Sequence, residues 1–272
     1  MIKQALRSGL DRTGLVAQAY DVRAHARYAT DRTTRRENDE FRAAGAPDGL
    51  PLPSPSLVYL VAGHFHVEWY YSSGVAHAAL LKELLAANGV RLEDVHSLLD
   101  FGCGCGRVIR HWRDEPVESV HGSDYNQRLV QWCRGALPFA EFRTNGFEPP
   151  LDYAGGEFDF VYAISVFTHL TESLQHAWMR ELERVLAPNG LLAFTTKGRS
   201  RLGSLSAAEV ERFNRGELVV QEGRYDGRNL CAAYHPEEYV RERLAGRLDV
   251  VDARPASGGD QSQDVFLLRK PG

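Results

Sequence analysis

The feature that most constrains the fold is a regular alternation of strand-like and helix-like segments between Val95 and Gly198. Short apolar segments predict strands at residues 95–101, 119–124, 140–146, 158–165 and 190–198. Segments with helical spacing of their apolar residues lie between these strands, at 107–112, 126–137 and 171–186. This order predicts a parallel sheet with helices on both faces.

The segments outside this region follow other patterns. A Pro/Gly/Ser-rich stretch, Gly45–Ser56, predicts a linker that follows short, exposed helices in residues 1–48, and a helix is expected over 76–89. After Gly198 we expect a helix with a capping box at Ser206–Glu209, then a hairpin over 217–234 that turns near Asp226–Gly227. A last helix over 235–246 and an antiparallel strand pair, 247–253 and 263–270, complete the expected order.

Composition limits the kinds of partner. The 272 residues carry a formal net charge of −4, which provides no general attraction for nucleic acid or an anionic membrane. No apolar run approaches the roughly 20 residues that span a bilayer. The first residues, "MIKQALRSGLDRTG", lack the apolar core of a secretory signal, so we expect a cytoplasmic, reducing location. The four cysteines do not indicate a disulfide scaffold.

Glycines at 102, 104 and 106 lie between a predicted buried strand and a predicted helix. Such a loop lets the backbone approach a ligand closely. A helix that begins at Arg107 would add free amide donors and a positive dipole end, which favour an anionic group.

The short motif itself excludes several ligands. The dinucleotide pattern G-x-G-x-x-G fits poorly because the third glycine comes one residue early, and a G-x-x-x-x-G-K-[ST] phosphate loop is absent from the sequence. Cys103 and Cys105 have neither the spacing of a zinc pair nor that of a C-x-x-C redox motif. We therefore expect small side chains in a tight turn, and no metal.

The segment "LLDFGCGCGR" resembles motif I of the class I S-adenosylmethionine-dependent methyltransferases, and later segments resemble further motifs of this family in order. The resemblance is greatest to the bacterial small-molecule branch called type 11 or type 12. It implies an α/β, Rossmann-like fold with a seven-stranded, mostly parallel sheet, an antiparallel last strand and helices on both faces. We predict an N-terminal helical extension and linker over 1–55. A methyltransferase domain follows over 56–272, with 198–234 as a substrate-side insertion.

The resemblance also implies S-adenosylmethionine as the cofactor and S-adenosylhomocysteine as its product. The cofactor-binding residues that it implies are Asp100, Gly102, Cys103, Gly104, Asp124, Tyr125, Asn145, Gly146, Ser165 and Val166. In this set Asp124 would accept the ribose hydroxyls and Tyr125 would pack on adenine. Structural alternatives stay open: Asp100 as a loop brace, Asp124 as a cap of the next helix, and Asn145 with Gly146 as a plain turn.

The acceptor side has two groups of candidates. His169 and His235 are candidate catalytic bases because imidazole titrates near neutrality, and each has a helix-entry role as the alternative. The remaining candidates for the substrate pocket are His64, His66, Trp69, Tyr70 and Phe167. The first four would form an aromatic lid, with ordinary core positions for Trp69 and Tyr70 as the less favoured alternative. His64, His66 and Glu68 are too rich in histidine for a magnesium site.

These features together predict an S-adenosylmethionine-dependent methyltransferase that acts on a small organic acceptor, such as a natural product or a sugar. O- or N-methylation is expected, and C-methylation is an option. RNA or protein methylation and a non-catalytic module that binds S-adenosylmethionine are the alternatives. The expected partner is the small-molecule acceptor, and the N-terminal extension could form a homo-oligomer.

Overall fold

The computed structural model describes residues 15–221, 231–257 and 262–272, with side chains from residue 22 onward. The chain divides into two compact units, Met1–Tyr70 and Tyr71–Gly272. Each unit is built around its own set of contacts.

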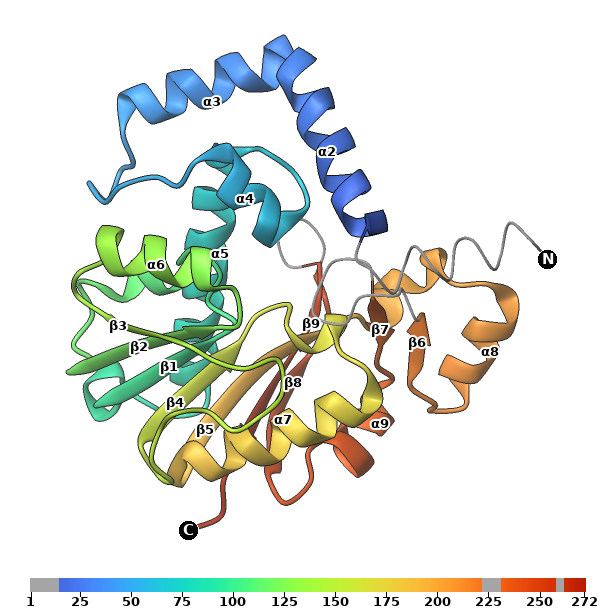
Figure 1. Cartoon of the computed structure of the whole chain (residues 1–272). Helices are drawn as coiled ribbons and strands as arrows, with labels where there is room; N and C mark the ends of the chain where they lie inside the picture. The colour runs from blue at the N-terminus through green and yellow to red at the C-terminus, as the bar shows by residue number, and fades with distance from the viewer. Residues whose placement is uncertain (1–14, 222–230, 258–261) are drawn as a thin grey trace. The chain divides into compact units, whose positions relative to one another are not determined.

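The described part of the first unit is helical (Figure 1). It contains α2 (Leu15–Thr30), α3 (Arg32–Ala44) and α4 (Pro55–Ala62), and α5 (Val67–Ala87) begins in it. The exposed helices predicted for this region are present, since α3 buries just Thr34 and Asn38. Ser54 caps α4 and Pro55 occupies its first turn, which places the end of the Pro/Gly/Ser-rich stretch at a helix start.

A buried amide organises this unit. The Asn38 Nδ2 group donates to the Phe65 carbonyl, and its Oδ1 accepts the Val67 N–H, both at 2.8 Å. The Phe65 ring stacks between Tyr28 and Tyr59, with ring centroids 4.4 and 4.7 Å apart. The unit therefore has a small aromatic core of its own.

The second unit contains a seven-stranded sheet in the order β3-β2-β1-β4-β5-β9-β8 (Figure 1). Its strands are β1 (Ser97–Phe101), β2 (Ser119–Asp124), β3 (Glu141–Thr144), β4 (Phe158–Ala163), β5 (Leu186–Thr196), β8 (Asp249–Arg254) and β9 (Asp264–Arg269). The first five strands run parallel, whereas β9 is antiparallel to both β5 and β8. The predicted sheet, including its reversed last strand, is confirmed.

Alternation along β4 produces two apolar layers. Val161 and Ala163 join the main core, which α7 (Glu172–Val185) covers with Trp178 and Leu182. Tyr162, between these two residues along the strand, faces the other layer. There its ring centroid lies 6.0 Å from that of Trp112. The helix α6 (Gln127–Ala136) connects β2 to β3, with Asn126 as its N-cap.

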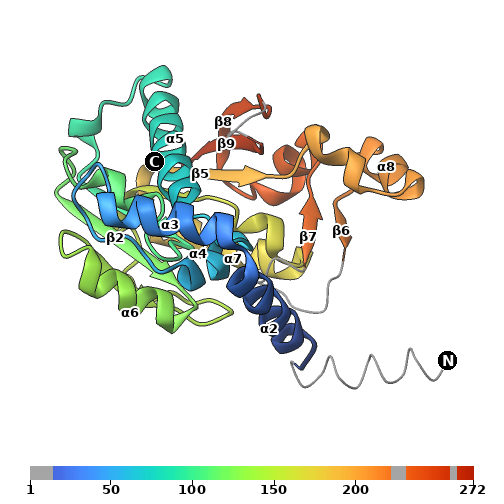
Figure 2. The same ribbon diagram turned by 90° about the horizontal axis from the view of Figure 1, so that it is seen from above.

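The segment after β5 forms a separate small cluster beside the carboxyl end of that strand (Figure 1, Figure 2). It contains α8 (Ala207–Asn214), with the predicted capping box, and the antiparallel pair β6 (Val219–Gln221) and β7 (Ala232–Tyr234). The predicted hairpin arms are thus present, and its turn near 226–227 lies outside the described residues.

Three local predictions need correction. Residues 107–112 are not an α-helix but turns followed by the 3-10 helix η2 (Ile109–Trp112), in which the His111 N–H donates to the Val108 carbonyl three residues back, at 3.1 Å. The last helix is a short α9 (Glu237–Tyr239) that continues as the π-helical turn η5 (Val240–Leu244). Thr171 precedes α7 as predicted, but its hydroxyl makes no capping hydrogen bond.

Candidate functional site

The glycine loop after β1 is held in a conformation that side chains oppose. Gly102 and Gly104 have φ values of +77° and +56°. The N–H groups of Gly102 and Cys103 both donate to the Ser123 carbonyl, at 2.8 and 3.0 Å. A Cβ atom on Gly102 would lie 2.4 Å from Cγ2 of Val166. The loop is therefore fixed between the ends of β2 and β4, with bare backbone at its surface.

Asp124 at the end of β2 braces this loop. Its Oδ2 accepts the Gly104 N–H at 2.9 Å, and its Oδ1 accepts the Asn126 N–H at 2.8 Å. Burial raises the pKa of this carboxyl to about 6. Each carboxylate oxygen has two lone pairs, so both oxygens can still accept a ligand hydroxyl. The geometry is compatible with ribose binding. The contact with the Asn126 N–H is a turn hydrogen bond, and the N-cap of the next helix is Asn126 rather than Asp124.

Asp100 lies in β1 directly before the loop and is 3% exposed. Burial, as the largest effect, raises the pKa of its carboxyl to about 7; the Arg107 guanidinium opposes this shift and Asp124 adds to it. Two buried acids beside one loop favour a cation there, because a positive charge would restore their ionised forms. The sulfonium and the ammonium group of S-adenosylmethionine carry such charges.

The helix α5 supports the loop from the other side. A Cβ atom on Gly74 would lie 2.0 Å from the Arg107 carbonyl oxygen, so helix and loop are in backbone contact. The buried Arg107 guanidinium approaches Ser73 Oγ (3.4 Å) and His77 Nδ1 (3.0 Å). The sequence interpretation missed Gly74 and Arg107, because a glycine within a helical pattern carries no sign of its distant neighbour.

Cys103, Cys105 and Cys133 pack beneath the loop, and all three side chains are buried. The Cys133 Sγ–H points to the Gly104 carbonyl at 3.5 Å. Burial, as the largest effect, raises the pKa of the Cys105 thiol. A protonated buried thiol is inert, which agrees with small side chains that pack a tight turn.

Two exposed aromatic rings lie beyond the ends of β2 and β3. Tyr125 and Phe147 are 41% and 39% exposed, and their rings meet edge to face with centroids 6.1 Å apart. Asn145 lies between them in sequence and accepts the Ser123 hydroxyl on Oδ1 at 2.6 Å, while its Nδ2 group donates to the Gly146 carbonyl. Phe147 was not among the predicted residues, although an aromatic directly after an Asn-Gly turn at a strand end was a readable signal.

The end of β4 is strained. Ser165 has a φ of +63°, which is unfavourable for a residue with a side chain. Its N–H donates to Thr195 Oγ1 at 2.7 Å, and its hydroxyl donates to Gln263 Oε1 at 3.1 Å. The strained turn places Val166 against Gly102. Phe167, however, is fully buried and packs on Phe194, 5.0 Å between ring centroids, which favours a core role.

The two candidate bases are both held by the protein. Nδ1 of His169 contacts the Cys231 carbonyl at 2.8 Å, and burial lowers the pKa of this imidazole to about 4. Nε2 of His235 contacts Gln175 Oε1 at 2.9 Å, and complete burial lowers its pKa to about 3. A neutral imidazole of such low pKa is a weak base at neutral pH. The contacts of His235 favour the structural alternative.

The predicted lid residues belong to the first unit. The rings of His64 and Trp69 meet edge to face at 4.4 Å, and the His66 N–H donates to His64 Nδ1 at 3.3 Å. Trp69 is 38% exposed, whereas Tyr70 is buried. Glu68 lies inside α5, so it does not alternate with the two histidines along an extended strand. That these side chains line the acceptor pocket remains a prediction.

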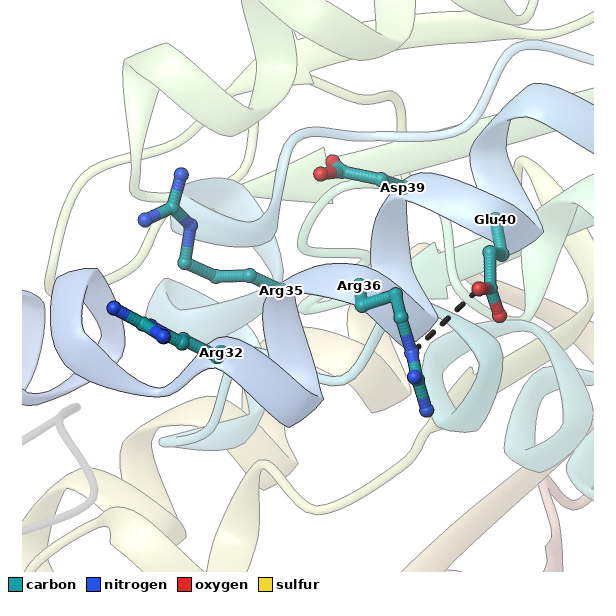
Figure 3. A pocket seen from close by; sticks show the side chains of 5 residues that line it. All are labelled: Arg32, Arg35, Arg36, Asp39 and Glu40. Atoms are coloured by element: carbon teal, nitrogen blue, oxygen red, sulfur yellow. Dashed lines mark ion pairs between the residues drawn. The ribbon is translucent and has the colours of Figure 1, made fainter.

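The first unit also carries a charged pocket of about 360 Å³ along one face of α3 (Figure 3). Its lining consists of Arg32, Arg35, Arg36, Asp39 and Glu40. Arg36 and Glu40 form an exposed i,i+4 pair at 3.6 Å, as the dashed line in Figure 3 marks. This arrangement is typical of a solvated helix face and contains no group suited to methyl transfer.

Within the described residues, every helix is too short or too polar to cross a bilayer.

Fold and loop together define a class of protein. A seven-stranded sheet with a reversed inner strand, a glycine loop after β1 and an acid at the end of β2 are features of the class I S-adenosylmethionine-dependent methyltransferases. Residues 99–194 match the family described as "Methyltransferase domain". Over this segment the chain matches a methyltransferase domain, which supports the predicted family, enzyme class and cofactor.

Particular relatives give a narrower comparison. A malonyl-[acyl-carrier protein] O-methyltransferase of Enterobacter lignolyticus is 33% identical over 111 residues, 41% of this chain and 43% of that protein. The chain spans about half the length of the curated relatives that it matches.

Solved structures share the fold. The 1,6-didemethyltoxoflavin-N1-methyltransferase of Burkholderia thailandensis has a TM-score of 0.53 and 16% identity, over 82% of this chain and 92% of that one. An S-adenosylmethionine-dependent methyltransferase of Methanosarcina mazei has a TM-score of 0.51 and 18% identity, over 69% of this chain and 97% of that one.

Proposed function

We propose that this protein transfers the methyl group of S-adenosylmethionine to a small organic acceptor. The observation that carries the proposal is the Gly102–Gly104 loop, whose bare backbone is fixed by the buried carboxylate of Asp124. A Cβ atom on Gly102 would meet Val166, and the two acids beside the loop, Asp100 and Asp124, suit a cationic nucleoside.

Different residues of the chain would bind different parts of the cofactor. Asp124 would accept the ribose hydroxyls, Asp100 would face the positive groups of the methionine part, and Tyr125 with Phe147 would enclose the adenine ring. When bound, the cofactor supplies an electrophilic methyl carbon, which bonds to an acceptor lone pair as its bond to sulfur breaks and that electron pair stays on sulfur. The protein contributes alignment and the exclusion of water.

The weak candidate bases favour an acceptor from which no proton has to be removed. Because the pKa of His169 is about 4, this residue is poorly suited to remove a proton from an alcohol. An acceptor atom that already carries a free lone pair, such as a carboxylate oxygen, needs no base. The relative named above acts, by its name, on a malonyl-[acyl-carrier protein], so malonyl thioesters should be assayed first.

The described residues of the segment over 198–234, which are 198–221 and 231–234, are proposed to border the acceptor. Support comes from α8, β6 and β7, which gather beside the carboxyl end of β5, because ligands of open α/β sheets bind at that edge.

Calorimetric titration with S-adenosylhomocysteine tests the cofactor site. We expect micromolar-range binding by the wild type and a loss of affinity of at least about tenfold in Asp124→Asn, since charged hydrogen bonds to the loop and the ribose are removed. Asp249→Asn, at an exposed carboxylate of β8, is the matched control and should bind normally. Unchanged affinity in Asp124→Asn would refute the proposed site.

A further inference from the structure

Lys197 follows β5 directly, at the carboxyl edge of the sheet. Its carbonyl accepts the His235 N–H at 2.8 Å, and its backbone pairs with Tyr234 of β7. Its Nζ lies 5.6 Å from the centroid of the Tyr234 ring. Backbone pairing and this ring contact hold the half-buried side chain near one position.

This ammonium group differs from the other described lysines. Lys82 pairs with Glu115, and Lys270 donates to the Leu186 carbonyl at 2.6 Å. Lys197 has no carboxylate within ion-pair distance in residues 15–221, 231–257 and 262–272. Burial, followed by the nearby Arg201 guanidinium, lowers its pKa. A partly desolvated cation next to another cation is unfavourable unless an anion joins them.

The position of this cation is close to the proposed methyl-transfer site. Thr195, two residues before Lys197, holds the strained Ser165 N–H at 2.7 Å, and Ser165 precedes Val166 at the glycine loop. His169 is near enough that the Lys197 charge lowers its pKa. Lys197 therefore lies on the β5 side of the cofactor residues, where an acceptor would enter.

We propose that Lys197 binds an anionic oxygen group of the acceptor, a carboxylate or a phosphate, and so selects acidic acceptors. This inference rests on the proposed methyl transfer. The ammonium would exchange its cation–π contact with Tyr234 for a charge-assisted hydrogen bond, and Arg201 would add to the attraction. The exposed Arg199 serves a different purpose, since it donates to Asn214 Oδ1 at 3.0 Å.

The test uses the full chain loaded with S-adenosylhomocysteine and titrated with malonate, inorganic phosphate and the neutral malonamide. We expect an anion to bind and malonamide not to bind. Lys197→Gln should weaken anion binding by about 10- to 100-fold, as expected for loss of a charged hydrogen bond, and Lys197→Arg should restore most of it. Arg180→Gln, at an exposed arginine of α7, is the control and should bind like the wild type.

A second readout is the Lys197 ammonium itself, followed by NMR of its ε-carbon; a bound anion should raise its pKa. Preference for malonate or for phosphate distinguishes the two anion sources. Equal binding of malonate and malonamide, no binding of either anion, or unchanged binding in Lys197→Gln would overturn the proposal. Failure to bind S-adenosylhomocysteine in the first place contradicts the proposed function instead, so the two failures are distinguishable.

Discussion

At the scale of single residues, Gly102 shows most directly how the loop depends on a missing side chain. Its φ of +77° and the 2.4 Å approach of Val166 oppose any Cβ atom. We expect Gly102→Ala to lower the free energy of unfolding by about 1–3 kcal/mol and to abolish measurable binding of S-adenosylhomocysteine. Urea denaturation and calorimetry would measure both effects.

Gly135 in α6 is the control for that substitution, because a Cβ atom there meets nothing within 4 Å. Gly135→Ala should leave binding unchanged and stabilise the helix by up to about 1 kcal/mol. If both alanine variants bound S-adenosylhomocysteine normally, the cradle would not depend on Gly102.

The buried acid Asp100 predicts a pH dependence of stability. Its pKa rises from 3.8 to about 7 on folding, so the native state keeps a proton that the unfolded chain releases. The contribution of this group is fully present below pH 3.8 and is lost as the pH rises through about 7. Its slope is at most about 1.4 kcal/mol per pH unit.

The free energy of unfolding should be measured for the wild type and for Asp100→Asn from pH 4 to pH 8. The difference between the two isolates the contribution of this carboxyl from those of the other groups that titrate. The asparagine variant should gain stability relative to the wild type as the pH rises. A difference that is constant over the whole range would contradict the raised pKa.

At the scale of elements, one buried amide connects α7 to the segment after β7. The Gln175 Nε2 group donates to the Leu170 carbonyl, and Oε1 meets His235 Nε2, each at 2.9 Å. Gln175→Ala should cost about 1–3 kcal/mol, because the buried imidazole loses its partner, whereas the exposed Gln131→Ala should be neutral. If His235 is instead a catalytic base, the buried variant will lose activity without a matching loss of stability.

The elements were largely readable from sequence. Val95–Phe101 and Phe158–Ser165 gave β1 and β4 because apolar segments bounded by turn residues carry their own signal. The helix expected at 107–112 failed because Gly106 and the contact of Arg107 with Gly74 are set by tertiary packing. For the same reason the sequence around Lys197 gave no sign that its ammonium group has no acid partner among the described residues.

At the scale of the whole molecule, the division into two units predicts that they open separately. Asn38→Ala removes both hydrogen bonds that join α3 to Phe65 and Val67. Amide hydrogen exchange should accelerate in residues 28–67 while β1 stays protected, and the exposed Asp39→Ala should change neither. Equal acceleration in β1 would show that the units open together.

The place of β9 in the sheet affects how the sheet forms during synthesis. Although it comes last in sequence, it lies between β5 and β8 and pairs with both. During synthesis, β5 and β8 therefore leave the ribosome without the partner that joins them, and the sheet closes after Arg269 emerges. Until then both strands expose unpaired edges, so a ribosome that stalls before β9 would release a chain prone to aggregate.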